Sequence, residues 1–194
     1  ASMKDSKKRV IIVEGGPGTG KSVITEYLEE NNYTKLYFGG ITYKLMKEAG
    51  IERTEDGKSE KEFREKLRTE HGPECYAKFL EPEIKEALKK GDVVLDGLYS
   101  WYEYKYLIER FENLKLVCVV TDKHIRYERV AVRPDRPFDE DAIKYRDLSE
   151  IENLYKGGPI AYADYYILNN HDKEETVEEN VSYGKNGKGK IKLD

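Results

Sequence analysis

The sequence is poor in cysteine and histidine. Its two cysteines, Cys75 and Cys118, show no CxxC spacing, and its three histidines lie far apart in the chain. A disulfide framework needs several cysteines, and a structural zinc site needs Cys and His ligands at short, regular spacing. The sequence therefore predicts neither a disulfide framework nor a structural zinc site.

The sequence also lacks a long apolar run and an excess of positive charge. No stretch approaches the roughly 18 apolar residues of a membrane-spanning helix, and no signal-peptide core is present. With 34 basic and 38 acidic residues the net charge is −4, which disfavours binding to a nucleic-acid backbone. We therefore expect a cytoplasmic protein with no membrane and no nucleic-acid partner. Residues 1–3 resemble an expression scar, and we expect them to have no role in the fold.

The chain does contain a glycine-rich segment after the apolar residues 10–13. It opens a segment of helical periodicity and matches the pattern G-x-x-x-x-G-K-[ST] without a mismatch. In such a loop, backbone N–H groups and the N-terminus of the following helix surround the phosphates of a nucleotide. The residues expected to contact the nucleotide here are Gly15, Gly16, Pro17, Gly18, Thr19, Gly20, Lys21, Ser22 and Val23.

Two side chains of this loop have specific expected roles. Lys21 should reach the β- and γ-phosphates of ATP, and the Ser22 hydroxyl should be a ligand of Mg²⁺. The alternative is an ordinary glycine-rich turn between a strand and a helix. The strand–loop–helix context favours nucleotide binding, so ATP and Mg²⁺ are the expected cofactors.

Short apolar runs alternate with segments of helical periodicity along the chain. Strands are expected at residues 9–14, 33–38, 92–96, 114–121 and 164–168. Helices are expected from the loop to about residue 32, and at residues 41–49, 60–69, 73–90, 101–111, 122–133 and 139–155. This alternation predicts one α/β domain with a parallel sheet of about five strands and helices on both faces.

Glycine and proline mark the expected ends of several elements. Gly39-Gly40 should close the second strand, and Gly157-Gly158-Pro159 should end the last long helix. Pro82 should kink or split its helix. At residues 101–111 a period-2 spacing of tyrosines competes with a helical register, and the longer apolar register favours helix.

An aspartate ends the third apolar strand, in the stretch Val93-Val94-Leu95-Asp96-Gly97. Its carboxylate should emerge at the carboxyl edge of the sheet, where ligands bind in open α/β folds. Asp96 is therefore, with Ser22, a candidate ligand for Mg²⁺. A strand-end aspartate can also cap a turn, and the upstream phosphate loop favours the metal role.

Arginines cluster at residues 126–146. Arg126, Arg129 and Arg133 share a helix face by their spacing. Arg133, Arg136 and Arg146 are candidates for a lid that surrounds a transferred phosphoryl group with cations, since guanidinium groups bind phosphate oxygens in pairs. The alternative is a solvated helix face with local ion pairs, and we expect that for Arg129.

Three other charged residues have two interpretations each. Glu14 directly precedes the loop, so it either meets the substrate or a metal-bound water, or it accepts a hydrogen bond from a loop N–H. Arg64 and Arg68 either hold an acceptor phosphate or lie on a charged surface helix, which is favoured. The aromatic patch at residues 99–102 is expected to be part core and part cleft wall, and core packing is favoured over stacking on a base.

Together these motifs resemble the P-loop nucleoside-monophosphate-kinase group, which includes adenylate kinase, the pyrimidine monophosphate kinases and dephospho-CoA kinase. The resemblance covers roughly residues 8–183, and Arg146-Asp147 is among its specific parts. It is strongest to dephospho-CoA kinase-like ATPases, through the segments 96–100, 158–161 and 163–170. It implies a three-layer fold with strand order 2-3-1-4-5. It also implies that Asn169 leads into the loop beside the adenine of ATP.

The same resemblance divides the chain into functional regions. Residues 8–183 are expected to form a single domain, with an acceptor-binding region at residues 38–90 and an arginine-rich lid at residues 133–146 that closes over ATP. Residues 184–194 should form a flexible tail, because they are rich in glycine and lysine.

The acceptor is less clear from the resemblance. Gly39-Gly40 stands where dephospho-CoA kinases tend to carry an aspartate, and Tyr43-Lys44 where many nucleotide kinases place an arginine. Glu14 is similar to the acid before the loop of thymidylate and cytidylate kinases. A hydroxyl acceptor would need a base, and the candidates are Asp96 and Glu14.

The sequence thus predicts an ATP-dependent small-molecule kinase, monomeric or homodimeric, that transfers the γ-phosphoryl group to a nucleotide-type acceptor as dephospho-CoA kinase does. A nucleoside monophosphate kinase is one alternative. A regulatory ATPase whose lid motion is the output is an alternative of another class. The residues expected to be catalytic are Lys21, Asp96, Arg133, Arg136, Arg146 and Glu14.

Overall fold

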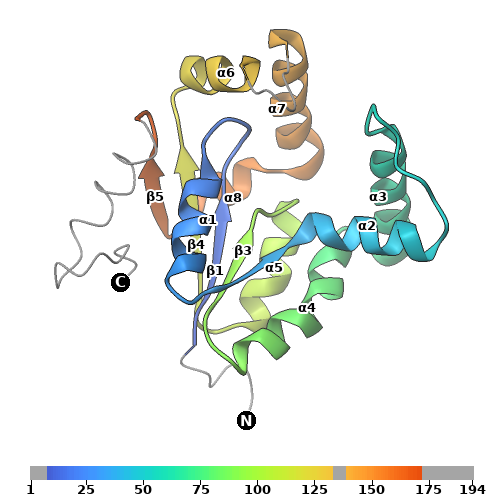
Figure 1. Ribbon diagram of the computed structural model, residues 1–194, viewed down its shortest axis with the longest axis vertical. Coiled ribbons are helices and arrows are strands. Elements are labelled where there is room, and N and C mark those ends of the chain that lie inside the picture. Colours follow the sequence, from blue (N-terminus) through green and yellow to red (C-terminus); the bar gives the residue numbers. More distant parts are fainter. Residues whose placement is uncertain (1–7, 133–138, 172–194) are drawn as a thin grey trace.

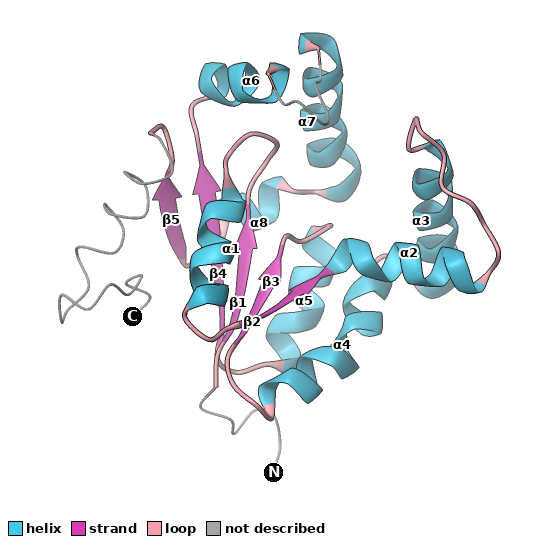
Figure 2. Cartoon of the chain, viewed as in Figure 1, coloured by secondary structure: helices cyan, strands magenta, loops and turns pink. Residues whose placement is uncertain are grey.

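The computed structural model describes residues 8–132 and 139–171. Five parallel strands form one sheet, and they are β1 (Val10–Glu14), β2 (Thr34–Tyr37), β3 (Val93–Asp96), β4 (Leu114–Val120) and β5 (Tyr165–Leu168). Their spatial order is β2-β3-β1-β4-β5, and their arrows point the same way in Figure 2. The predicted fold class and strand order are therefore confirmed.

Helices connect the strands and extend beyond them. They are α1 (Lys21–Glu30), α2 (Phe38–Glu48), α3 (Lys58–His71), α4 (Cys75–Leu88), α5 (Trp101–Arg110), α6 (Lys123–Ala131), α7 (Glu140–Leu154) and α8 (Gly157–Ala161). None of the helices in the described segments has the length and apolarity to cross a bilayer.

Side chains of β1 alternate between two cores, as expected for a strand buried on both faces. Val10 and Ile12 pack in a core with residues of α4 and α5, whereas Ile11 and Val13 pack with Ile24 of α1. All five side chains are at most 1% exposed. The result is three layers, with α1 on one face of the sheet and α4 and α5 on the other (Figure 1).

The remaining helices are placed around the carboxyl ends of the strands. In Figure 1, α6 and α7 lie above this edge, and α2 and α3 extend to one side of it. Asp139 caps α7, because its carboxylate accepts a hydrogen bond from the Ala142 N–H at 2.7 Å. The carboxyl edge of the sheet is therefore the part of the molecule where loops and helices from distant segments meet.

The glycine pair Gly39-Gly40 does not close a strand as predicted. Both residues lie in α2, which begins directly after β2. A Cβ on Gly39 would lie only 2.4 Å from the Tyr37 ring. The Tyr37 ring, which is 53% exposed, packs against the backbone at residue 39, so a side chain there would have to displace this ring.

The structure refines two further expectations about helix boundaries. Pro82 does not split α4, which runs unbroken from Cys75 to Leu88. The fully buried Leu80 and Ile84 flank the proline, so core packing offsets the hydrogen bond that proline cannot donate. α7 ends at Leu154, shortly before residues 157–159 as expected, and these residues in turn open α8, where Pro159 is buried.

Candidate active site

The loop between β1 and α1 lines a cavity of about 280 Å³ at the carboxyl edge of the sheet. All residues from 15 to 22 contribute to its wall, whereas Val23 lies in the first turn of α1 and does not. Gly20 has φ 74°, a left-handed conformation that glycine adopts without strain. A Cβ there would lie 2.4 Å from Asn169 Nδ2, so the approach of that side chain also requires glycine.

Side chains from distant segments hold the loop from behind. The carbonyl groups of residues 17–19 accept hydrogen bonds from Arg126 Nη1 (3.1 Å), Arg129 Nη1 (3.2 Å) and Asn169 Nδ2 (2.6 Å), in that order. The Thr121 hydroxyl in turn donates to the Asn169 carbonyl at 2.8 Å. The ends of β4 and β5 and the helix α6 thus fix the shape of the loop before any ligand binds.

Two of the predicted chemical groups meet across adjacent strands. The register pairs Val13 of β1 with Asp96 of β3, which brings the end of β3 beside the start of the loop. Lys21 Nζ lies 3.8 Å from Asp96 Oδ1, and both residues line the cavity. The Ser22 hydroxyl belongs to the first turn of α1 and lines the same cavity.

The oxygen atoms at this position suit a magnesium ion that arrives with a nucleotide. Mg²⁺ usually keeps several waters and takes one or two protein ligands together with phosphate oxygens. Ser22 and Asp96 supply a hydroxyl and a carboxylate on one cavity wall. Within residues 8–132 and 139–171, no three His, Cys, Asp or Glu side chains are grouped for a metal bound by protein alone. The residues present therefore fit a nucleotide-bound metal.

Glu14 lies behind the loop, buried to 2% exposure. Its Oε1 accepts a hydrogen bond from the Gly15 N–H at 2.9 Å and lies 3.3 Å from Lys156 Nζ. Lys156 also donates to the Leu98 carbonyl and lines the cavity. Sequence reasoning missed Lys156, because a lysine after a charged helix gives no signal of burial.

The predicted lid arginines are only partly described. Arg146 of α7 lines the cavity, and its Nε lies 3.3 Å from Glu150 Oε1. Arg133 and Arg136 lie outside the described residues. The neighbouring Asp147 accepts two hydrogen bonds from Arg126, at 2.8 and 3.1 Å, and so connects α6 with α7.

The expectation of a solvated position for Arg129 is wrong. Its side chain donates to the Gly18 carbonyl and, at 2.9 Å, to the His171 carbonyl. Arg126 occupies the preceding turn of the same helix and contacts the loop as well. The helical spacing of the two arginines directly after β4 was a usable signal, because a helix that starts at this edge of the sheet faces the loop.

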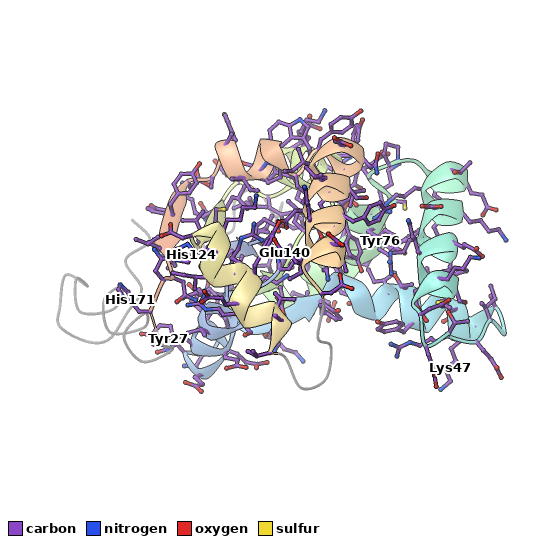
Figure 3. All side chains as sticks on the ribbon, turned by 90° about the horizontal axis from the view of Figure 1, so that it is seen from above. Tyr27, Lys47, Tyr76, His124, Glu140 and His171 are labelled. Atoms are coloured by element: carbon purple, nitrogen blue, oxygen red, sulfur yellow. The ribbon has the colours of Figure 1, made fainter. Side chains whose placement is uncertain are left out.

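An aromatic wall closes the other side of the cavity. It consists of Tyr37, Phe38 and Tyr99, which all line the cavity. Tyr99 packs edge-on against Phe38, with ring centroids 5.7 Å apart, and against Tyr76 at 4.9 Å. In the view from above, Tyr76 lies between α7 and α3 (Figure 3). The aromatic patch that follows β3 is therefore partly core and partly cavity wall.

Charged side chains lie behind this aromatic wall. The Arg68 guanidinium carbon lies 5.5 Å from the Tyr76 ring centre and 5.4 Å from that of Tyr99, and Arg68 Nε is buried. Glu103 of α5 is fully buried, and neither of its carboxylate oxygens has a hydrogen-bond partner among the described residues. Burial raises the pKa of Glu103 to about 7, although the positive charge of Arg68 lowers it in part.

Comparison with known proteins assigns this chain to a family. A family model described as an AAA domain matches residues 11–154. A UPF0200 protein of Thermococcus onnurineus is 33% identical over 171 residues, which cover 86% of this chain and 91% of that protein.

Solved structures with the same fold include two kinases. Shikimate kinase from Bacteroides thetaiotaomicron has a TM-score of 0.56 at 14% identity, covering 88% of this chain and 95% of that one. Dephospho-CoA kinase from Campylobacter jejuni has a TM-score of 0.52 at 19% identity, covering 87% and 92%. Identities this low support a similarity of fold alone. The family model and the 33% identical relative both span most of the chain, and the chain therefore belongs to the UPF0200 family, with an AAA domain over residues 11–154.

Proposed function

We propose that this protein is an ATP-dependent kinase that phosphorylates a small, nucleotide-type acceptor, as dephospho-CoA kinase does. One observation carries the proposal: the phosphate loop, Asp96 and Arg146 line the same cavity as the aromatic wall. Groups suited to a phosphoryl donor and a surface suited to an organic acceptor therefore face each other in one cavity. The proposal treats residues 8–183 as one domain, with an acceptor region at residues 38–90.

The proposed roles follow from position and charge. Lys21 binds the β- and γ-phosphates, and Ser22 with Asp96 would hold Mg²⁺, which supplies positive charge to the phosphate oxygens when it is bound. Arg146 approaches from α7, and Arg133 and Arg136 complete the proposed lid. In the transfer, an acceptor oxygen forms a bond to the γ-phosphorus while the bond from that phosphorus to ADP breaks.

The surroundings of the two acidic residues favour Asp96 over Glu14 as the base for a hydroxyl acceptor. Asp96 lines the cavity, whereas Glu14 is buried behind the loop and paired with Lys156. A base must come within hydrogen-bond reach of the proton that it removes. If the acceptor is a phosphate, no base is needed, and Asp96 serves the metal alone.

A coupled assay of ADP formation tests the proposal. The purified protein is supplied with MgATP and, in turn, dephospho-CoA, each nucleoside monophosphate, shikimate and gluconate. We expect one acceptor to stimulate ADP formation, with a phosphorylated product visible by mass spectrometry. Slow hydrolysis that no acceptor stimulates would contradict the kinase proposal and would favour a regulatory ATPase. The Lys21→Ala variant is the control for a contaminating kinase.

A further inference from the structure

Lys156 joins three segments that are distant in the sequence. It precedes α8 and follows α7, the helix that carries Arg146. Its ammonium group donates to the Leu98 carbonyl in the loop after β3 and lies 3.3 Å from Glu14 Oε1 at the end of β1. The end of α7 is thereby connected to the two strand ends that carry the phosphate loop and Asp96.

The pair formed by Lys156 and Glu14 is almost fully withdrawn from solvent. The side chains are 11% and 3% exposed, respectively. Glu14 Oε2 is buried and has no hydrogen-bond partner among the described residues. Charges in such surroundings are poorly screened by water and salt, so each acts strongly on its neighbours.

Glu14 lies where a negative charge would oppose phosphate binding. Its carboxylate accepts a hydrogen bond from the first N–H of the phosphate loop, that of Gly15, and Gly15 itself lines the cavity. An uncompensated carboxylate there would repel the phosphates of a nucleotide. Lys156 lines the same cavity and brings an opposite charge to this carboxylate.

We propose that Lys156 is a positioning residue that neutralises Glu14 beneath the phosphate loop, so that the net charge of this buried pair sets the affinity of the loop for polyphosphate. The inference rests on the proposed binding of a nucleotide at the loop. It requires neither a particular acceptor nor phosphoryl transfer.

Four proteins test this inference by calorimetric titration with MgADP. They are the wild type, Lys156→Met, Glu14→Gln and the double variant. We expect Lys156→Met to bind MgADP about tenfold more weakly and Glu14→Gln to bind it more tightly by about threefold or more, because one charge of the pair is removed in each. The double variant restores neutrality and should bind within about threefold of the wild type.

A purely structural role would give another pattern. Lys156→Met would then lower the melting temperature without weakening the binding of MgADP, or the double variant would bind MgADP as weakly as Lys156→Met does. Either result would overturn the inference. If Lys156→Met does not fold, the Glu14→Gln variant still tests the proposal, because an unchanged or weaker affinity of this variant for MgADP contradicts it. Wild-type protein that does not bind MgADP would refute the proposed function itself, which separates the two failures.

The exposed pair Glu86 and Lys89 at the end of α4 is the matched control. Its side chains are 69% and 62% exposed and lie 2.9 Å apart, and α4 leads into the amino end of β3, away from the cavity. The variants Lys89→Met, Glu86→Gln and their combination change the same charges. We expect MgADP affinity within about twofold of the wild type for all three, since exposed charges at this distance are screened.

Discussion

The phosphate loop and the aromatic wall face each other across one cavity, yet they are held in place by different interactions. The loop is fixed by hydrogen bonds to successive carbonyl groups, from Arg126, Arg129 and Asn169. The aromatic wall is fixed by edge-on ring packing, with charged side chains behind it. Of these, Glu103 and the Nε of Arg68 have no hydrogen-bond partner within the described residues.

This difference indicates how substitutions on each side of the cavity affect ligand binding and stability. A loop whose carbonyl groups are already bonded keeps its shape when an anion binds, so little ordering is needed. A buried charge without a hydrogen-bond partner is costly, and it lowers stability until something compensates it. We therefore expect substitutions at the loop to act mainly on nucleotide binding, and those behind the aromatic wall to act mainly on stability and its pH dependence.

The largest effect is expected for Lys21→Ala, which removes the main positive charge of the loop. Loss of one such electrostatic group typically lowers the rate by about 10²–10³-fold. We expect a loss of this size in acceptor-stimulated ADP formation, with an unchanged melting temperature, because Lys21 is partly exposed. The control is Lys35→Ala on β2, a lysine that is similarly exposed at 31%. Equal activity of the two variants would show that Lys21 does not take part in phosphoryl transfer.

Glu103→Gln tests the side behind the aromatic wall. The pKa of this carboxyl is raised from 4.5 to about 7 in the folded protein, so the folded state holds a proton that the unfolded chain has released. The contribution of Glu103 to stability is therefore largest below about pH 4.5, and about 3 kcal/mol of it is lost as the pH rises through about 7. The variant should lose this fall and be the more stable protein at pH 8.

Urea unfolding of both proteins at pH 5 and pH 8 measures this difference. The exposed Glu109→Gln on the same helix should leave the pH dependence as it is in the wild type. A Glu103→Gln variant whose stability falls with pH as steeply as that of the wild type would show that the burial of Glu103 has no such consequence.

Asn169→Ala tests how the loop is supported. It leaves the buried Thr19 carbonyl without its amide donor, which should cost about 2 kcal/mol of unfolding free energy. Because the loop loses one of its supports, MgADP should also bind more weakly. The exposed Asn153→Ala, which removes only a 3.1 Å bond to Ser149, is the control. A loop that tolerates Asn169→Ala with no loss of stability or affinity would not be fixed in the manner described.

Only a small effect on stability is expected for Arg146→Gln. Its ion pair with Glu150 is partly exposed, with Arg146 at 46%, and such pairs contribute up to about 1 kcal/mol. If Arg146 serves the phosphoryl group, the variant should nevertheless turn over MgATP about tenfold more slowly. Equal losses of turnover in Arg146→Gln and Glu150→Gln would indicate that the ion pair matters and not the arginine.

Local sequence was enough for the sheet and for the phosphate loop. Continuous apolar runs such as residues 10–13 predict strands buried on both faces. The glycine–lysine–serine motif predicts a loop that binds phosphate. The supports of the loop were not predictable in the same way. Arg129 resembled a surface residue, because its partners at Gly18 and His171 are distant in the sequence.

The sequence by itself determined that this protein has a parallel α/β fold and a loop with the pattern of a phosphate-binding loop, because strand periodicity and the loop motif are properties of contiguous residues. Only the tertiary structure decided the environment of Glu14. Its partner Lys156 is 142 residues away in the chain and reaches it because α8 returns to the carboxyl edge of the sheet. Burial and charge pairing depend on which distant segments come into contact, and short-range sequence patterns do not predict those contacts.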